Sequence, residues 1–293
     1  MIDTELKDKV VVVTGANHGI GAATAEAFSQ QGAAVFIHFW RLPVNLLGST
    51  KEKAEKAVRP GVDYYSRVIM QSAEMVAEKI KKRGGNVFTW ETDLSIPDNI
   101  PRIFDLAEQN LGDVSIVVNN AAFGNNDTFL PQKALEKSPY FAEEYKIRPL
   151  TAATHDEHFS VNSRGTALMM AEFARRHINR GSQWGRIINI STDGARGHAF
   201  NVSYGASKNA VESYTRAAAY ELGPYGITVN GISPGAVQTG WMPENLEKSL
   251  AESYPLRRVG RPEDIADAVV FFASKQADWI TGQVLYVGGG NAM

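Results

Sequence analysis

The chain has 293 residues, no cysteine and a formal net charge of −2, because 30 Lys and Arg residues are set against 32 Asp and Glu residues. The lack of cysteine excludes disulfide bonds, cysteine-ligated metals and a thiol nucleophile. The near-neutral charge gives no overall attraction to nucleic acid, and no apolar run approaches the roughly 20 residues that span a bilayer. Residues 1–9 are polar and charged, unlike a secretory signal, so we expect a cytoplasmic protein that binds neither nucleic acid nor membrane.

Apolar, β-branched runs alternate with helical patterns along the chain. The first run, at 10–13, reads Val-Val-Val-Val and ends in Thr-Gly, and a helical pattern then extends from Gly21 to a stop at Gly32. Runs this apolar are typical of strands buried on both faces of a parallel sheet. Further strands are expected at 35–37, 86–92, 114–119, 185–190, 228–232 and 283–287. We therefore predict one α/β domain over residues 1–293, with a doubly wound parallel sheet of about seven strands and helices on both faces.

Two helix starts carry capping signals. Ser95 precedes Pro97 and Asp98, which predicts an N-cap serine, a proline inside the first turn and an acid near the positive end of the helix. Thr154 and Glu157 have the spacing of a capping box, in which each side chain satisfies a free backbone amide. Both signals predict that a helix begins at these residues.

Two connections are longer than compact domains usually need, at about 42–65 and at 123–153. A charged piece at 49–58 has a helical pattern, and we interpret it as a solvated excursion of the surface. A helix is expected to follow at about 66–83. Long connections are more often functional than idle, so both are candidates for shaping a ligand site.

The turn between the first strand and the first helix has the composition of a phosphate-binding site. Its glycines, spaced G-x-x-x-G-x-G, permit a tight turn and a close approach of the backbone to a diphosphate. The helix start that follows offers free amides and the positive end of the helix dipole to the anion. The residues expected to bind a nucleotide here are Gly15, Asn17, His18, Gly19, Ile20 and Gly21.

The end of the second strand indicates which nucleotide binds. NAD-binding folds usually place a carboxylate there to hold the ribose hydroxyls, but this chain has His38, Trp40 and Arg41 and no acid. The planar fork of Arg41 suits a 2′-phosphate, and His38 lies in a segment that can assist. We therefore expect NADP(H) in preference to NAD(H). Asp93, after the third strand, is expected either to accept a hydrogen bond from the adenine amine or to organise Ser95 at the helix start.

Tyr204 and Lys208 are four residues apart, a spacing that sets them on one face of a helix. Free tyrosine has a pKa near 10, and a neighbouring ammonium favours the phenolate and lowers that pKa. Tyr204 is therefore a candidate general acid or base tuned by Lys208. Ser191 ends the fifth strand, at the edge of the sheet where ligands bind in this architecture, so its hydroxyl is a candidate to hold a substrate oxygen beside the phenol.

Taken together, these pieces resemble the short-chain dehydrogenase/reductase family. The resemblance covers essentially the whole chain, and the matching pieces occur in the order of the family. They are the turn at 14–21, Asp93, the stretch at 119–122, Asn162, Ser191, Tyr204 with Lys208, and the stretch at 234–239. The resemblance implies a single-domain Rossmann fold, a nicotinamide dinucleotide and a catalytic set of Ser, Tyr, Lys and Asn.

The resemblance also implies a role for each matching residue. Tyr204 would protonate the carbonyl oxygen as hydride arrives from the nicotinamide, and Lys208 would bind the nicotinamide ribose. Ser191, which the thirteen-residue spacing to Tyr204 selects over the adjoining Thr192, would steady the carbonyl, and Asn162 would help hold a water that relays protons to Lys208. The implied nucleotide contacts are Asp93, Leu94, Asn119 and Ala121 on the adenosine side, and Pro234, Gly235, Val237 and Thr239 near the carboxamide and diphosphate.

The implied substrate is a small ketone or secondary alcohol, and the resemblance is broadest to 3-oxoacyl carrier-protein reductases. The basic residue that those enzymes often carry before the stretch at 226–230 is Tyr225 here, which disfavours a docked acidic carrier protein. Pteridine reductases share the His-aromatic-x-Arg stretch at 38–41. A pteridine-type or quinone reductase and a nucleotide-binding sensor without turnover stay open as alternatives, although the retained Tyr204 and Lys208 favour an enzyme.

Three expectations complete the sequence analysis. A substrate lid is expected at 240–258, with an amphipathic helix packed on the core as the alternative. Family members usually form dimers or tetramers through helices that correspond to 160–180 and 203–222 and through the C-terminal segment, so we expect a homo-oligomer. His155 and His158 share a helix face, but no further ligand is identifiable, so no metal is expected.

Overall fold

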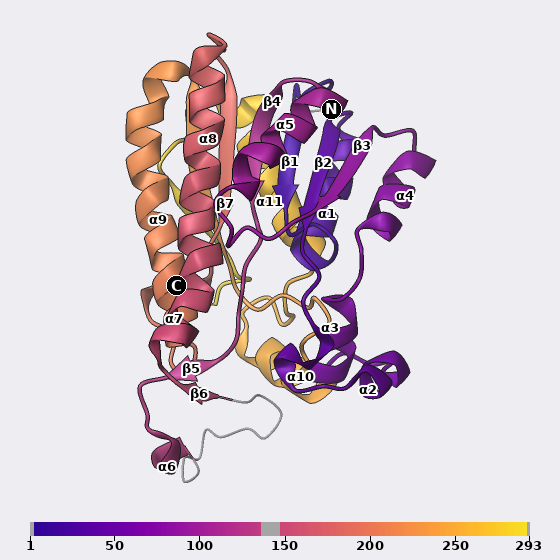
Figure 1. The fold of residues 1–293 in the computed structure, drawn as a ribbon, viewed down its shortest axis with the longest axis vertical. Helices are drawn as coiled ribbons and strands as arrows, with labels where there is room; N and C mark the ends of the chain where they lie inside the picture. Colours follow the sequence, from indigo (N-terminus) through magenta and orange to yellow (C-terminus); the bar gives the residue numbers. More distant parts are fainter. Residues whose placement is uncertain (1–2, 136–146, 292–293) are drawn as a thin grey trace.

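The computed structural model describes residues 3–135 and 147–291, and its centre is a sheet of seven parallel strands (Figure 1). The strand order is β3-β2-β1-β4-β7-β8-β9, so the chain starts in the middle of the sheet and builds outward in both directions. This confirms the predicted doubly wound sheet, and each strand covers a run that its apolar residues predicted. The strands are β1 (Val10–Thr14), β2 (Ala34–Phe39), β3 (Val87–Glu91), β4 (Val114–Asn119), β7 (Gly185–Ile190), β8 (Ile227–Pro234) and β9 (Val284–Val287).

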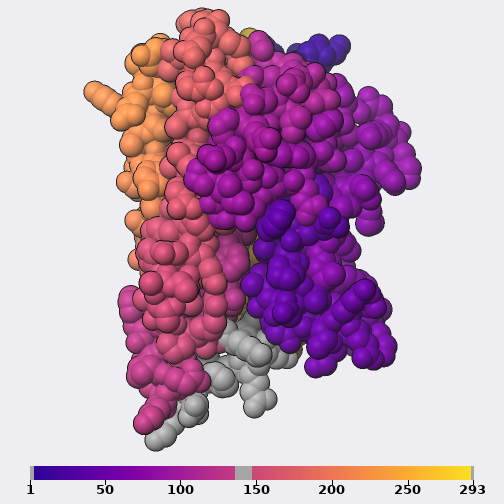
Figure 2. All heavy atoms as spheres, in the orientation of Figure 1, coloured from indigo at the N-terminus to yellow at the C-terminus, as the bar shows by residue number. Residues whose placement is uncertain are grey.

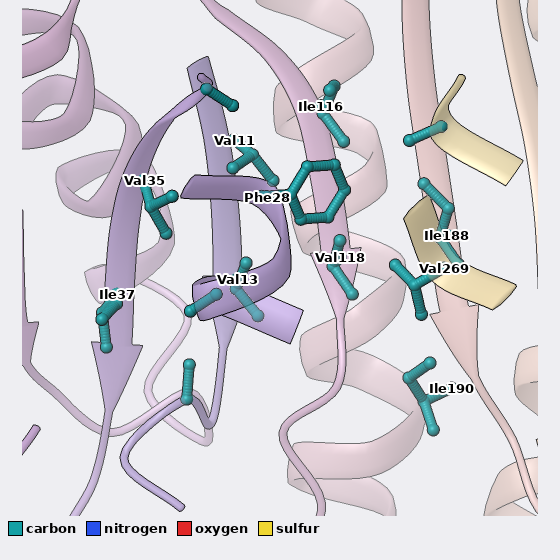
Figure 3. Close-up of a cluster of buried hydrophobic side chains, with 14 of the residues drawn as sticks. Val11, Val13, Phe28, Val35, Ile37, Ile116, Val118, Ile188, Ile190 and Val269 are labelled. Carbon is teal, nitrogen blue, oxygen red and sulfur yellow. The ribbon is translucent and has the colours of Figure 1, made fainter. Parts of the chain in front are cut away.

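Helices cover both faces of the sheet and enclose one hydrophobic core on each. Figure 3 shows the first core, in which the ring of Phe28 lies among Val11, Ile116 and Val118 from the strands, all fully buried. Truncating a buried phenylalanine typically costs about 3–5 kcal/mol, so this packing is a main source of stability. The first face carries α1 (Gly19–Gln30), α4 (Glu74–Lys82) and α11 (Pro262–Ala273), and the second carries α5 (Asn99–Leu111), α8 (Thr166–Asn179) and α9 (Val202–Leu222).

The helix expected at 66–83 is in fact two helices, α3 (Val62–Val68) and α4, with a turn between them. In a continuous helix, the carbonyl groups of this segment would accept hydrogen bonds from amides four residues later. Instead, the carbonyl of Ile69 accepts from the amide of Leu42, and the carbonyl of Gln71 accepts from Asn17 Nδ2 at 2.8 Å. Long-range hydrogen bonds therefore interrupt the helix, and hydrophobic periodicity does not reveal them.

The helix start predicted at Ser95 lies several residues before the observed start. The helix that follows, α5, begins at Asn99 and has no side-chain hydrogen bond from its N-cap residue. The amide of Ser95 instead donates to Asp93 Oδ1 at 2.8 Å, which is one of the two roles expected for Asp93. The carboxylate of Asp93 is a strong acceptor and organises the turn before the helix.

The capping box expected at Thr154 also begins too late. Helix α7 (Ala152–His158) is capped by Thr151, and Thr154 is the third residue inside it, where the two threonine side chains form the reciprocal pair. Glu157 binds Arg148 at 2.8 Å instead of a free amide. A threonine at the third helical position can replace the glutamate of a capping box because its hydroxyl also accepts from the N-cap amide.

The connection after β2 lies beyond the carboxyl ends of the strands, at the lower right of Figures 1 and 2. It holds a 3₁₀ turn, η1 (Val44–Leu47), and α2 (Lys51–Lys56), whose charged residues are exposed. The predicted helical, solvated piece at 49–58 is therefore confirmed. The residues after it pack inward, because the amide of Gly61 donates to the carbonyl of Gly240 at 3.0 Å.

The connection at 123–153 supports the helix α9. It contains β5 (Asp127–Thr128) paired with β6 (Arg148–Pro149), and the short helix α6 (Gln132–Leu135), while residues 136–146 lie outside the described part of the chain. Asp127 is fully buried, and its Oδ1 accepts from the amide of Ser203 at 2.9 Å in the first turn of α9. A carboxylate at this position complements the positive end of the helix.

The segment expected as a lid contains α10 (Glu244–Ser253). Met242, just before it, is fully buried, while Leu246 and Leu250 on the helix are half-buried. Whether α10 moves on substrate binding stays a prediction. Within residues 3–135 and 147–291, no helix combines the length and apolar character that crossing a bilayer requires.

Candidate active site

The turn from β1 into α1 forms a cradle without room for side chains. Gly15 and Gly19 have φ angles of +64° and +53°, in the left-handed region that favours glycine. A Cβ atom at Gly21 would lie 2.3 Å from the carbonyl oxygen of Gly15, so any side chain there would displace the turn. Helix α1 begins without a side-chain cap, which leaves its first amides available to an anion. The cradle fits the diphosphate of a dinucleotide.

Asn17 and His18 of this turn are held in place by a hydrogen bond to the residues between α3 and α4. Asn17 Nδ2 donates to the carbonyl of Gln71 at 2.8 Å, and its Oδ1 lies 3.1 Å from His18 Nδ1. Burial lowers the pKa of His18 to about 4, so the ring is neutral at pH 7 and brings no positive charge to a phosphate. Ile20 is half-buried and packs against the hydrophobic core, and its expected contact to the nucleotide stays a prediction.

His38 is a structural residue, which corrects the expectation that it assists at a 2′-phosphate. It is 1% exposed, with Nε2 2.8 Å from the carbonyl oxygen of Thr92 and Nδ1 accepting from the amide of Gly15 at 3.4 Å. Burial lowers its pKa to about 4, and a neutral imidazole that donates through Nε2 and accepts through Nδ1 satisfies both partners. His38 therefore ties the residue after β3 to the first glycine of the phosphate turn.

The structure brings an acid beside Arg41, where the sequence shows none. Strands β2 and β3 pair in a register that sets Phe39 beside Glu91. Glu91 binds the guanidinium of Arg41, with Nε 2.9 Å from Oε1 and Nη2 2.8 Å from Oε2. These hydrogen bonds lower the pKa of Glu91, so the carboxylate is ionised at neutral pH. Arg41 is half-exposed, as is Trp40, and can reach a phosphate, but it shares its charge with Glu91.

The end of β4 is joined to β1 through Thr14. The hydroxyl oxygen of Thr14 accepts from the amides of Asn120 and Ala121, each at 3.0 Å. The side chain of Asn119 turns into the core, where it donates to Asn189 Oδ1 at 2.8 Å. Asn119 is 4% exposed, so its side-chain amide belongs to a buried network, and its expected place on the adenosine side stays a prediction.

Asp93 and Leu94 follow β3 on the expected adenosine side. Asp93 is half-buried, and the amide of Ser95 occupies its Oδ1. Leu94 is buried in the second core, so only its backbone is placed to contact a nucleotide. The glycine at 165 packs against the backbone of Leu94, with a Cβ position 3.4 Å from its carbonyl oxygen.

Helix α9 places Tyr204 and Lys208 on one face, as their spacing predicted. Lys208 Nζ lies 5.8 Å from the centroid of the Tyr204 ring and donates to the carbonyl of Ile190 at 2.7 Å. Burial lowers the pKa of Lys208 to about 8. The pKa of Tyr204 is raised, first by burial and then by the charges of Tyr65 and Asp193. The prediction that Lys208 lowers this pKa is therefore wrong here, because desolvation of the phenolate dominates and the ammonium is directed at Ile190.

The hydroxyl of Ser191 is hydrogen-bonded to helix α9. It donates to Glu212 Oε1 of α9 at 2.9 Å, and both residues are buried. Thr192, the next residue, is also nearly buried and caps the 3₁₀ turn η3 (Asp193–Arg196), accepting from the amide of Gly194 at 3.3 Å. The Thr192 hydroxyl donates to Asp193 Oδ1 at 3.3 Å, so it is a second hydroxyl at this strand end.

Asn162 lies in a π-helical turn, η2 (Phe159–Gly165), between α7 and α8. Its side chain is fully buried and is held by the backbone of Phe123, accepting from the amide at 2.7 Å and donating to the carbonyl at 2.9 Å. It also donates to Ser207 Oγ at 2.9 Å on α9. π-Helical turns are frequent at functional sites, and the expected role of Asn162 in holding a water stays a prediction.

Residues 234–239 follow β8 at the carboxyl edge of the sheet. A Cβ atom at Gly235 would lie 2.9 Å from the Cα of Gly288, so the close backbone approach requires glycine. Val237 is 5% exposed and packs in the core. Thr239 faces the phosphate turn, because its Cγ2 lies 3.0 Å from the Cβ position of Gly19. The turn and this segment, which both carry expected nucleotide contacts, therefore lie against each other at this edge of the sheet.

Tyr65, in α3, is a site residue that the sequence analysis missed. Its ring meets the ring of His18 edge-on at 5.8 Å, and its phenol hydrogen-bonds the side chain of Thr239. It also interacts electrostatically with Tyr204. No local sequence pattern marks Tyr65, because all of these partners are distant along the chain.

His155 and His158 face different surroundings, although they share α7. The ring of His155 stacks on Phe159 with 4.1 Å between centroids. His158 is fully buried, with Nδ1 2.7 Å from the carbonyl oxygen of Thr154. Among the residues that the structure describes, no group of three or more metal-ligating side chains comes together.

Comparison with known proteins shows which proteins the whole chain is similar to. The sequence model of the family described as "Enoyl-(Acyl carrier protein) reductase" matches residues 47–292. The chain is 31% identical to versicolorin reductase of Emericella nidulans, over 97% of this chain and 96% of that protein. It is 30% identical to 3-oxoacyl-(acyl-carrier-protein) reductase FabG of Aquifex aeolicus, over 99% of both. A solved double mutant of a short-chain dehydrogenase/reductase from Serratia marcescens superimposes with a TM-score of 0.74, at 27% identity, over 98% of this chain and 99% of that one.

Proposed function

Because the chain belongs to the short-chain dehydrogenase/reductase family of oxidoreductases, we propose that it is an NADPH-dependent enzyme that moves hydride between the nicotinamide and a ketone or secondary alcohol. The single observation that carries this proposal is the position of Tyr204 and Lys208. The two side chains share one face of α9 beside the end of β7, and the phosphate cradle lies at the same edge of the sheet. Ligands of doubly wound folds bind at this edge.

The bound dinucleotide would supply the hydride, and the residues of the chain would bind, orient and move a proton. Tyr204 is proposed as the proton donor to the carbonyl oxygen. The buried ammonium of Lys208 donates one proton to the carbonyl of Ile190, so its other two protons can bind the nicotinamide ribose. Asn162 is proposed to act from the π-helical turn, where it braces α9 through Ser207.

The hydroxyl that steadies the substrate carbonyl is proposed to come from Thr192. The sequence analysis assigned this role to Ser191, but the Ser191 proton is committed to Glu212. Successive side chains of an extended segment alternate in direction, so a serine that faces α9 leaves the next residue facing the other way. The Thr192 hydroxyl donates to Asp193 Oδ1 at 3.3 Å, a longer and less buried hydrogen bond than that of Ser191, and it would exchange this bond for one to a substrate oxygen.

The preference for NADPH is proposed to rest on Arg41, the half-exposed guanidinium at the end of β2. The pairing of Arg41 with Glu91 is expected to reduce the preference for NADPH, because the same carboxylate would repel a 2′-phosphate. The relative named as a 3-oxoacyl carrier-protein reductase supports a 3-oxoacyl-type substrate. Tyr225 at the place of an expected basic residue keeps a pteridine-type or quinone substrate as the second candidate.

We further propose that the protein acts in the cytoplasm as a homotetramer or dimer, without nucleic acid or membrane as a partner. The exposed surface of α9 supports an interface. It carries Tyr220, which is 89% exposed, and Tyr214, which is 38% exposed. Exposed aromatic side chains of this kind are found at interaction surfaces.

The test is oxidation of NADPH with a panel of 3-oxoacyl thioesters, diketones, quinones and pterins. We expect turnover on at least one class, and we expect Tyr204→Phe to abolish it while NADPH still binds. Tight NADPH binding without turnover on any class would instead favour a nucleotide sensor. Full activity of Tyr204→Phe would show that the proton donor is assigned wrongly.

A further inference from the structure

Tyr65 contacts two segments at which the dinucleotide is proposed to bind, the phosphate turn and the residues that follow β8. On one side, its ring meets His18 of the phosphate turn at 5.8 Å. On the other side, its phenol hydrogen-bonds Thr239, whose methyl group lies 3.0 Å from the Cβ position of Gly19. No other residue of α3 makes contacts of this kind to both segments among the interactions of the described residues. The side chain therefore lies between the phosphate turn and the segment that follows β8.

The rest of the connection holds Tyr65 firmly in this position. The amide of Gly61 donates to the carbonyl of Gly240 at 3.0 Å, and the amide of Tyr65 donates to the carbonyl of Gly61 at 2.8 Å. The ring of Tyr64 fills the space where a side chain at Gly240 would lie, 2.9 Å from its Cβ position. Arg67 covers the other ring face of Tyr64, 4.7 Å from the centroid. These contacts fix the start of α3 onto the segment that follows β8.

We propose that Tyr65 is a nucleotide-binding residue, whose phenol hydroxyl donates a hydrogen bond to the diphosphate of the bound dinucleotide from the side opposite the glycine turn. This inference rests on the proposed function and extends it to a residue of the long connection. The diphosphate carries two negative charges, and hydrogen bonds from neutral donors to such groups are stronger than those between neutral partners.

The surroundings of Tyr65 suit this role. His18 is buried and neutral at pH 7, so it supplies no cation to the diphosphate. Burial raises the pKa of the Tyr65 phenol, so it keeps its proton, and remains a donor, throughout the neutral range. The Thr239 hydroxyl, its present partner, is itself expected at the nucleotide and can rotate to another acceptor. Tyr65 can thus exchange one polar partner for another without a change in the fold.

The test compares dissociation constants for NADPH and adenosine 2′-phosphate by titration calorimetry. Tyr65→Phe removes one hydroxyl and keeps the ring, and Tyr64→Phe makes the same change at the adjacent position. We expect Tyr65→Phe to weaken NADPH binding by about tenfold or more, the loss typical of a hydrogen bond to a charged group. Adenosine 2′-phosphate, which has no diphosphate, should bind wild type and both variants equally. Tyr64→Phe should bind NADPH as wild type does.

Two results would overturn the inference. One is equal NADPH affinity of Tyr65→Phe and wild type, which would leave Tyr65 as a packing residue. The other is equal weakening of NADPH and adenosine 2′-phosphate, which would indicate general distortion of the site. Tyr65→Leu, which also removes the ring, provides a second variant and should weaken NADPH at least as much as Tyr65→Phe. If the wild-type protein binds no dinucleotide, the proposed function itself is refuted. This outcome is distinct from failure of the inference on Tyr65, which is seen only in the comparison of variants with wild type.

Discussion

The hydroxyl of Ser191 donates a hydrogen bond of 2.9 Å to the buried carboxylate of Glu212. The second oxygen of Glu212 lies 3.8 Å from Nη1 of Arg216, so the carboxylate has a hydrogen-bond donor on one side and a cation on the other. A buried carboxylate without such partners is costly. Ser191 therefore joins the end of β7 to α9, the helix that carries Tyr204 and Lys208, and supports the site without reaching into it.

This relationship separates the effects of two neighbouring hydroxyls. We expect Thr192→Val to lower kcat by about 10²–10³-fold, the usual loss when a donor to a developing oxyanion is removed. Thr192→Ser should retain most of the activity. Ser191→Ala should instead lower the free energy of unfolding by about 1–3 kcal/mol, because it leaves Glu212 with one donor fewer, and should change kcat only a few-fold. Steady-state kinetics and denaturant unfolding of the three variants measure both effects, and the opposite pattern would return the catalytic role to Ser191.

The Arg41–Glu91 pair predicts how the nucleotide preference responds to charge. Arg41→Ala should weaken NADPH binding and leave NADH binding nearly unchanged, because only NADPH carries the 2′-phosphate. Glu91→Gln should tighten NADPH binding about fivefold, since removing one nearby negative charge near the surface is worth about 1 kcal/mol. Dissociation constants for both nucleotides test this. If the NADPH to NADH ratio is the same in wild type and in both variants, the pair has no part in the preference.

The burial of Lys208 leads us to expect that Lys208→Met and wild type differ in stability by an amount that depends on pH. Its folded pKa of about 8 lies below the unfolded value of 10.5, so folding with a charged Lys208 is penalised at pH 7 and the penalty disappears as pH rises from 8 through 10.5. Lys208→Met should therefore be more stable than wild type at pH 7, by up to about 3 kcal/mol, and should lack turnover. At pH 9.5 this gain should shrink by about 2 kcal/mol.

Urea unfolding at the two pH values measures this difference, and Lys51→Met provides the control. The side chain of Lys51 is 76% exposed, so its removal should leave the difference from wild type independent of pH. A Lys208→Met protein that is less stable than wild type at pH 7 would show that the hydrogen bond to Ile190 outweighs the cost of burying the ammonium.

Gly21 predicts a steric limit in the phosphate cradle. A Cβ atom there would lie 2.3 Å from the Gly15 carbonyl oxygen and 2.5 Å from Asn120 Nδ2. Gly21→Ala should therefore lower stability by about 1–3 kcal/mol and weaken dinucleotide binding severely. Gly223→Ala is the matched control, because no heavy atom lies within 4 Å of its Cβ position and its φ of −52° suits alanine. Thermal unfolding and calorimetry compare the two, and wild-type nucleotide affinity in Gly21→Ala would contradict the cradle.

Much of the fold could be predicted because its signals are local. The seven apolar runs became the seven strands, since a strand buried on both faces must be apolar throughout. The glycine turn and the spacing of Tyr204 and Lys208 are likewise local patterns, and the structure places them where they were expected. The helix start expected at Thr154 failed because Thr151, three residues earlier, offers an equivalent cap that is compatible with the preceding strand pair.

The sequence by itself determined the architecture, the family and the residues that can carry the chemistry, because strand burial, glycine conformation and helical spacing depend on neighbours along the chain. Only the tertiary structure decided what each polar side chain does. In the folded protein, His38 hydrogen-bonds the backbone of Thr92, Ser191 hydrogen-bonds Glu212, and Arg41 hydrogen-bonds Glu91. It also set Tyr65 over the phosphate turn. The physical reason is that a buried donor or acceptor must find a partner, and the partners available to these residues are brought together by the packing of segments that lie 20 or more residues apart.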